Sequence, residues 1–119
     1  MSFQEVANMI STLNIPFAYR AFEQGTAQQC PFICYLYTGN TPEPADNTNY
    51  AKIETLAIEL YTDQKDFELE SQIETLLTNN ELVFDREESW LSDEKMQMTV
   101  YTMDVLITEP ITTEVQNNG

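Results

Sequence analysis

The chain has no histidine among its 119 residues, and this absence excludes several kinds of chemistry. Serine or cysteine nucleophiles activated by an imidazole, and most transition-metal sites, need that ring. The three glycines, at positions 25, 39 and 119, form no phosphate-binding loop. Catalysis by a hydrolase or metal-dependent nuclease would need paired carboxylates, and among twenty acidic residues such pairs arise by chance. We therefore expect a protein that is not an enzyme and has no cofactor and no metal.

Cysteine is scarce too, and the two cysteines are spaced so that they cannot act together. Cys30 and Cys34 lie in the apolar and aromatic segment QQCPFICYLYTG, residues 28–39. In an extended strand their Cα atoms would be about 13 Å apart, whereas a disulfide needs less than about 7 Å. Three residues separate them, so this is no CxxC motif, and no second ligand pair completes a zinc site. We expect inert, buried thiols in a strand that is apolar on both faces.

Positively charged residues are also scarce. Five Lys and Arg against twenty Asp and Glu give a formal charge of −15. Such a surface repels the phosphates of nucleic acid. It suits a basic protein surface, cations, or DNA that passes close by without binding, and solubility alone is the alternative explanation.

Long apolar runs are absent as well. No run approaches the roughly 20 residues that span a bilayer, and the start MSFQEVANMI has no signal-peptide pattern. We expect no membrane contact, and a protein kept in the cytoplasm unless it leaves within a larger assembly. A hydrophobic fraction of 42% with 11% aromatics is that of one folded domain.

Hydrophobic periodicity predicts an α+β fold in the order α-β-β-β-α-β-β. Ser2 and Glu5 form a capping box at the first helix, and Asn14 and Pro16 end it. The predicted elements are a helix over 2–13, strands over 17–23, the QQCPFICYLYTG segment and 52–62, a helix over 66–79, and strands over 82–88 and 96–107. We expect an antiparallel or mixed sheet of about five strands, the first three as an antiparallel meander, with both short helices on one face. The single domain covers 1–107, with an exposed loop over 38–50 and a polar tail over 108–119.

Two short helices cover only one face of such a sheet. The reverse sides of the second and third strands are apolar, and monomers seldom expose patches of that size, so copies of the chain are expected to associate there. The residues predicted for this subunit interface are Tyr35, Tyr37, Ile53 and Tyr61, with Arg20 and Arg86 as anchors of ion pairs. The charge run of Glu68, Glu70 and Glu74 is predicted to be a solvated helix surface.

Five sequence features, in their order along the chain, suggest a protein family. They are the amphipathic N-terminal helix, PFAY (16–19), PFICYLYTG (31–39), IELYTDQKD (58–66) and SWLSDEKMQMTVYTMDV (89–105). Together they resemble the tail terminator or tail completion proteins of long-tailed phages and prophages of Gram-positive bacteria. The resemblance covers residues 3–107 and contains no catalytic motif.

The resemblance implies a ring, commonly a hexamer, on the head-proximal end of the tail tube in the virion, assembled in the host cytoplasm. The ring would stop addition of the major tail protein and bind head-completion or connector proteins. We expect the loop with Pro42, Pro44 and Asp46 to meet a neighbouring ring. Acidic residues such as Glu68, Glu70 and Glu74, or the 85–88 hairpin, would let DNA pass through the lumen without specific binding.

Two alternatives remain open from the sequence. One is a head–tail connector or head-closure protein of the same assembly. The other is an acidic DNA mimic that inhibits a host nuclease, which would be a monomer or dimer with carboxylates spaced like phosphates.

Overall fold

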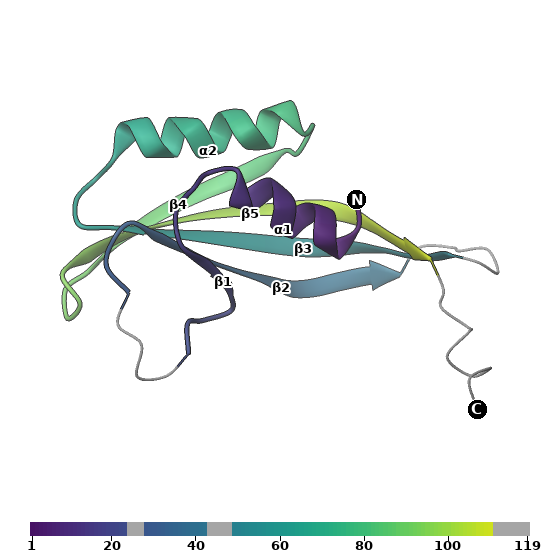
Figure 1. The fold of residues 1–119 in the computed structure, drawn as a ribbon, viewed down its shortest axis with the longest axis horizontal. Coiled ribbons are helices and arrows are strands. Elements are labelled where there is room, and N and C mark those ends of the chain that lie inside the picture. Colours follow the sequence, from purple (N-terminus) through teal and green to yellow (C-terminus); the bar gives the residue numbers. More distant parts are fainter. Residues whose placement is uncertain (24–27, 43–48, 111–119) are drawn as a thin grey trace.

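A computed structural model describes residues 1–23, 28–42 and 49–110 of the chain. Two helices lie over one face of a five-stranded sheet, which confirms the predicted fold class and element order (Figure 1). The elements are α1 (Phe3–Ser11), β1 (Phe17–Tyr19), β2 (Phe32–Pro42), β3 (Asn49–Thr62), α2 (Phe67–Asn79), β4 (Phe84–Leu91) and β5 (Met96–Pro110).

The strand order across the sheet is β1-β2-β3-β5-β4. All neighbouring strands are antiparallel except β1 and β2, which run parallel, so the predicted antiparallel meander is wrong at its first step. The strand expected over 17–23 ends at Tyr19, because Arg20 adopts a φ of 68° and turns the chain out of the sheet direction. The Arg20 N–H still donates to the Tyr35 carbonyl at 2.7 Å, which holds this turn against β2.

Hydrogen bonds define the start of α1, and the backbone conformation of Asn14 follows its end. Ser2 Oγ accepts from the Glu5 N–H at 3.0 Å while the Glu5 carboxylate accepts from the Ser2 N–H at 2.7 Å, which confirms the capping box. The Glu109 carboxylate accepts from the Phe3 N–H at 2.7 Å, so a second negative charge faces the positive end of the helix dipole. Asn14, with a φ of 59°, follows the end of the helix as predicted.

The strands extend further than predicted at one end of the sheet. β2 continues to Pro42 and β3 begins at Asn49, so most of the loop expected over 38–50 is hairpin strand, and 43–48 lie outside the described residues. β5 continues to Pro110 instead of ending at Ile107, and 111–119 are likewise outside them. The prediction failed here because pairing with neighbouring strands satisfies the backbone groups of a segment whose composition is polar.

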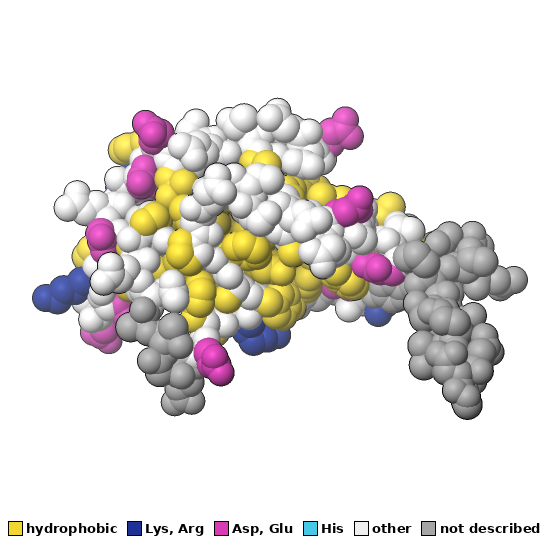
Figure 2. Space-filling model, viewed as in Figure 1, with side chains coloured by type: hydrophobic (Ala, Val, Ile, Leu, Met, Phe, Trp, Pro, Cys, Tyr) yellow, Lys and Arg dark blue, Asp and Glu magenta, His cyan; other side chains and the backbone are white. Residues whose placement is uncertain are grey.

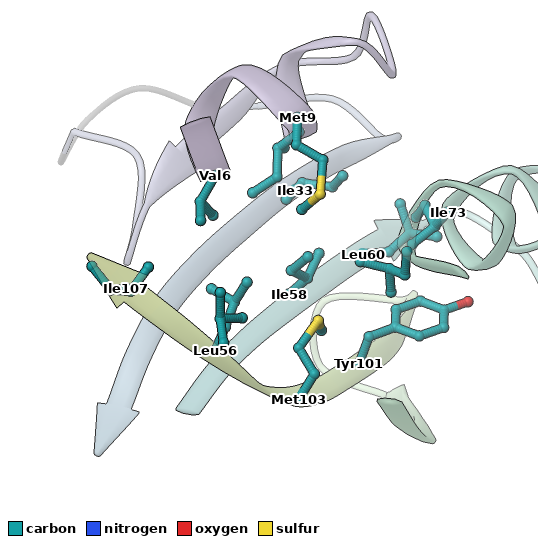
Figure 3. Close-up of a cluster of buried hydrophobic side chains, with 13 residues drawn as sticks. Val6, Met9, Ile33, Leu56, Ile58, Leu60, Ile73, Tyr101, Met103 and Ile107 are labelled. Carbon is teal, nitrogen blue, oxygen red and sulfur yellow. The ribbon is translucent and has the colours of Figure 1, made fainter. Parts of the chain in front are cut away.

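The core lies between the helices and one face of the sheet. Val6 and Met9 point from α1 toward Ile33, and Ile73 of α2 lies beside Leu60 and Tyr101 (Figure 3). Full burial of an aliphatic side chain of this kind contributes roughly 1.5–3 kcal/mol relative to exposure. The predicted core face of β3, formed by Leu56, Ile58 and Leu60, is confirmed, with exposures of 0%, 2% and 0%.

The glutamates of α2 do not form one solvated surface. Glu68 is exposed, but Glu70 is only 2% exposed and shares a helix face with Ile73 and Leu77. Its carboxylate accepts from Lys65 Nζ at 2.7 Å and from Thr99 Oγ1 at 3.2 Å. The prediction of a solvated face is therefore wrong for Glu70, because two donors from outside the helix replace its hydration.

Glu74 and Arg86 extend this polar cluster from the buried Glu70 toward the surface. The Arg86 guanidinium lies 2.8 Å from the Glu74 carboxylate and 3.5 Å from that of Glu70, and the Tyr101 hydroxyl donates to Glu74 at 3.0 Å. Burial, together with the neighbouring carboxylates of Glu74 and Glu70, raises the pKa of Tyr101 well above its ordinary value. Arg86 thus forms its ion pairs within its own chain, between α2 and β4.

Replacing Lys65 by Met should destabilise the fold by about 2 kcal/mol in urea unfolding followed by circular dichroism. The substitution leaves the Glu70 carboxylate buried with less compensation, and the cost is below that of a fully buried pair because Lys65 is 25% exposed. The double variant Lys65→Met/Glu70→Met should recover most of the loss, since an apolar pair needs no compensation.

Lys95→Met is the matched control, because Lys95 is exposed and has no ion pair among the described residues. Its unfolding free energy should stay within about 0.5 kcal/mol of the parent chain. Equal stability of the Lys65 and Lys95 variants would contradict the structural role of this cluster.

Candidate interaction surface

The second face of the sheet has no helical cover in the described part of the chain. Residues paired across neighbouring strands share a face, so the residues that alternate with the core positions form this surface, which we call the open face. Its apolar members on the three central strands are Phe32, Cys34, Leu36, Ile53, Ala57, Tyr61, Met96, Met98, Val100 and Leu106. This row of apolar residues runs across β2, β3 and β5 and is the candidate interaction surface.

Aromatic rings concentrate at one end of the open face. The rings of Phe32 and Tyr61 stack with centroids 4.8 Å apart, and Phe22 meets Phe32 edge-on at 5.6 Å. The Tyr61 hydroxyl donates to Glu59 at 2.9 Å, and burial together with this carboxylate raises the pKa of Tyr61. At the other end Leu106 is 51% exposed although its neighbour Ile107 is fully buried on the core face. The surface is therefore richest in aromatic contacts near Phe32, and toward Leu106 its apolar residues are interrupted by Thr55 and Asp104, which are joined by a hydrogen bond of 3.1 Å.

The four residues predicted for one subunit interface lie on two different faces. Ile53 and Tyr61 belong to the open face, as predicted for the reverse side of β3. Tyr35 and Tyr37 pair with Ile58 and Leu56 and therefore belong to the helix-covered face.

Contacts with other aromatic residues confirm the placement of the two tyrosines. The Tyr37 ring lies 5.1 Å from Phe3 of α1, and the Tyr35 ring lies 6.2 Å from Phe17. Tyr35 and Tyr37 are partly buried and pack against the core, and the residues of β2 that the prediction missed are Phe32, Cys34 and Leu36. Both sides of β2 are apolar, so its alternation alone did not show which side faces the helices.

The two arginines predicted to form ion pairs between subunits lie in different surroundings, and the predicted loop residues are described only in part. Arg20 is exposed at the end of β1, with Cζ 6.0 Å from the centroid of the Tyr19 ring. Arg86 is paired with Glu74, and its use between subunits would break that contact. Pro42 is the last residue of β2, and Pro44 and Asp46 lie outside the described residues.

Neither cysteine forms a disulfide among the described residues. Cys34 is 6% exposed on the open face, whereas Cys30 is half-buried just before β2, so the expectation of buried thiols holds fully for Cys34 alone. Burial raises the pKa of both thiols, and the carboxylates of Asp63 near Cys30 and Glu59 near Cys34 raise it further. Within the described ranges no group of three acidic or cysteine side chains is placed to hold a metal ion.

No family model matches the sequence, and no curated protein matches it. Neither helix of the described part is long and apolar enough to cross a membrane.

Alkylation of the folded chain by iodoacetamide at pH 8 should modify Cys34 about tenfold or more slowly than Cys30. The thiolate is the reactive form, so a raised pKa lowers its concentration at this pH for both cysteines, and burial adds a barrier at Cys34. Peptide mass spectrometry over time gives the two rates. In concentrated urea the rates should become equal, and equal rates in the folded chain would contradict the burial of Cys34.

Proposed function

We propose that this chain is a structural virion protein, a tail terminator that assembles as a ring on the head-proximal end of a phage tail tube. The observation that carries the proposal is the open face, an apolar sheet surface without helical cover in the described part of the chain. Proteins that work as monomers seldom expose large apolar patches to water. The order of segments that resembles the tail terminator family gives the assembly in which copies of the chain would cover it.

A ring requires contacts between two different surfaces of the same chain. When the rotation between neighbours closes, such heterologous contacts give a ring, and when it does not they give a fibre. Termination then follows from shape. One side of the ring matches the end of the tube, and the other side lacks the docking surface that the next tube subunit needs.

The negative charge suits a channel through which DNA moves without binding. Of the acidic residues suggested for the lumen, Glu70 and Glu74 are paired within the chain. Glu68 is exposed on α2, and Asp85 and Glu87 are exposed on β4. Asp85 and Glu87 pair with Thr102 and Val100 and therefore lie at the edge of the open face, so Glu68 is the exposed carboxylate that would face DNA, where its repulsion of phosphate would keep the DNA mobile.

The observations bear differently on the two alternative functions, a head–tail connector and a DNA mimic. A head–tail connector of the same assembly would use the same open face, so the proposal separates from it only by what loss of the protein does to tails. An acidic DNA mimic would need an array of carboxylates. On the face shown in Figure 2 the acidic side chains are spread around the periphery, and Glu70, Glu74 and Glu88 bind cations of their own chain. The mimic is therefore the less supported alternative.

An early stop codon in the gene, in a phage that carries it, should give tails of uncontrolled length and heads without tails in electron micrographs. Nothing would then end addition of the major tail protein. A plasmid copy of the intact gene should restore tails of one length. Tails of normal length beside full heads would overturn the terminator proposal in favour of a connector.

Tyr61→Asp should abolish self-association in sedimentation velocity and leave the circular dichroism spectrum unchanged. The new carboxylate lies on the open face next to Glu59, where it adds charge to the surface that copies would share. Val83→Asp is the matched control, because Val83 is 88% exposed in the turn between α2 and β4. A Tyr61→Asp chain that associates like the parent would exclude the open face as the interface.

A further inference from the structure

One edge of the sheet is only partly covered. β1 pairs with β2 only as far as Tyr35, and the Tyr37 N–H beyond it donates to the Tyr19 hydroxyl at 3.1 Å. No strand of the described ranges pairs with residues 38–42 on that side, and those before Pro42 are exposed. We call residues 38–42 the free edge of β2. It begins at a register shift and ends at a proline, which has no N–H, so it accepts only a short strand.

The two edges of the sheet differ in charge. β4, the edge strand on the other side, has four charged residues in a row, Asp85, Arg86, Glu87 and Glu88. Charged side chains on an edge strand hinder the addition of another strand. Residues 36–42 of β2, LYTGNTP, contain no charge, although the chain has twenty acidic residues. The free edge of β2 therefore lacks the charges that protect β4.

A segment suited to strand formation begins at the same end of the sheet. Pro110, the last residue of β5, and Pro42 both pair with the first four residues of β3. Residues 111–115, ITTEV, follow Pro110, and four of these five are β-branched, which favours extended backbone. Their only charge is that of Glu114. The segment is therefore a candidate for a strand that pairs with an uncharged edge.

The nearest edge of the same chain is already occupied. Met1 lies against β5 beyond the end of β4. Its amino group donates to the Leu106 carbonyl at 2.9 Å, and its carbonyl accepts from the Thr108 N–H at 2.9 Å. A segment that folded back from Pro110 along this side of β5 would displace Met1.

The free edge of β2 in the same chain is accessible only through a reversal. β2 and β5 both run antiparallel to β3, so a segment that continues in the direction of β5 leaves the sheet at the end where β2 also ends. Residues 111–115 contain no glycine, proline, asparagine, aspartate or serine, the residues that favour turns. Asn117, Asn118 and Gly119 come only after them. The sequence thus directs the segment toward another copy of the chain.

We propose that residues 111–115 of one copy pair as a strand with the free edge of β2 in a second copy. Main-chain hydrogen bonds hold the contact, and Ile111, Thr113 and Val115 share one face of the added strand. Each copy gives its segment to one neighbour and receives a segment from the other, which is a heterologous contact that can close into a ring. The inference rests on the proposed function and names a contact between neighbours in its ring.

Proline substitution in the segment tests the pairing in the full chain. Thr112→Pro/Thr113→Pro removes two successive N–H groups, one of which faces the partner strand in either register. Self-association should weaken about tenfold or more in sedimentation velocity over a concentration series. Asn117→Pro/Asn118→Pro, placed after the β-branched residues, is the matched control and should associate like the parent. Circular dichroism spectra of both variants should match that of the parent.

Crosslinking tests which part of the neighbour meets the segment. In a chain with Cys30→Ser and Cys34→Ala, one copy with Val115→Cys and another with Asn40→Cys should form a crosslinked dimer with a short bismaleimide. Neither variant should crosslink when it is alone, because the contact joins different parts of the chain. A mixture of Val83→Cys and Val115→Cys is the control and should stay uncrosslinked, since Val83 is exposed in the turn between α2 and β4.

A single chain with both Val115→Cys and Asn40→Cys separates pairing between copies from pairing within one. Crosslinked dimers and larger species support the proposal, whereas crosslinked monomers alone would overturn it. Equal association of the two double-proline variants would also overturn it and leave a ring built through the open face in place. If the parent chain stays a monomer at every concentration, the inference is overturned. The proposed function then still stands or falls on the tail lengths of the phage with the stop codon.

Discussion

The packing of two helices against one face of the sheet is the constraint on which the rest of the structure depends. Side chains alternate along a strand, so a single helical layer buries only one of the two apolar sets of β2, β3 and β5. Val6, Met9 and Ile73 supply that layer and leave the set that includes Phe32 and Tyr61 on the far side. A chain with polar residues at those far-side positions would be complete as a monomer. This chain places phenylalanine, tyrosine and methionine there, and the proposed association of copies would remove these side chains from water.

The Glu70 cluster connects the core to the outer surface of α2 and β4. A buried ion pair contributes little net stability relative to apolar residues, because desolvation offsets the attraction between the charges. Its geometry is nevertheless specific. Lys65 bonds to Glu70 on α2 and to Glu88 on β4, and it lies over the Phe67 ring. The same side chain therefore sets the position of the start of α2 relative to β4.

Local patterns of the sequence were enough for the elements and their order, because capping and periodicity are local properties. The box of Ser2 and Glu5, the closure at Asn14 and the core face of β3 all formed as predicted. Tertiary choices were not accessible in the same way. Which side of β2 faces the helices depends on its pairing with β3, and that choice places Tyr35 and Tyr37 in the core. The burial of Glu70 likewise depends on Lys65 and Thr99, which lie 5 and 29 residues away along the chain.

Net charge sets a condition on the association of copies that we propose. At −15 each copy repels the next, and this repulsion is screened over about 8 Å at physiological ionic strength. Contacts in the proposed ring must therefore remove apolar surface from water while keeping carboxylates apart or beside cations. At the Phe32 end of the open face, Arg20 and Glu94 line the same hollow, so a cation is available there beside a carboxylate. Removal of apolar surface from water must therefore supply most of the free energy of such a contact, because this chain has five cations to offset twenty carboxylates.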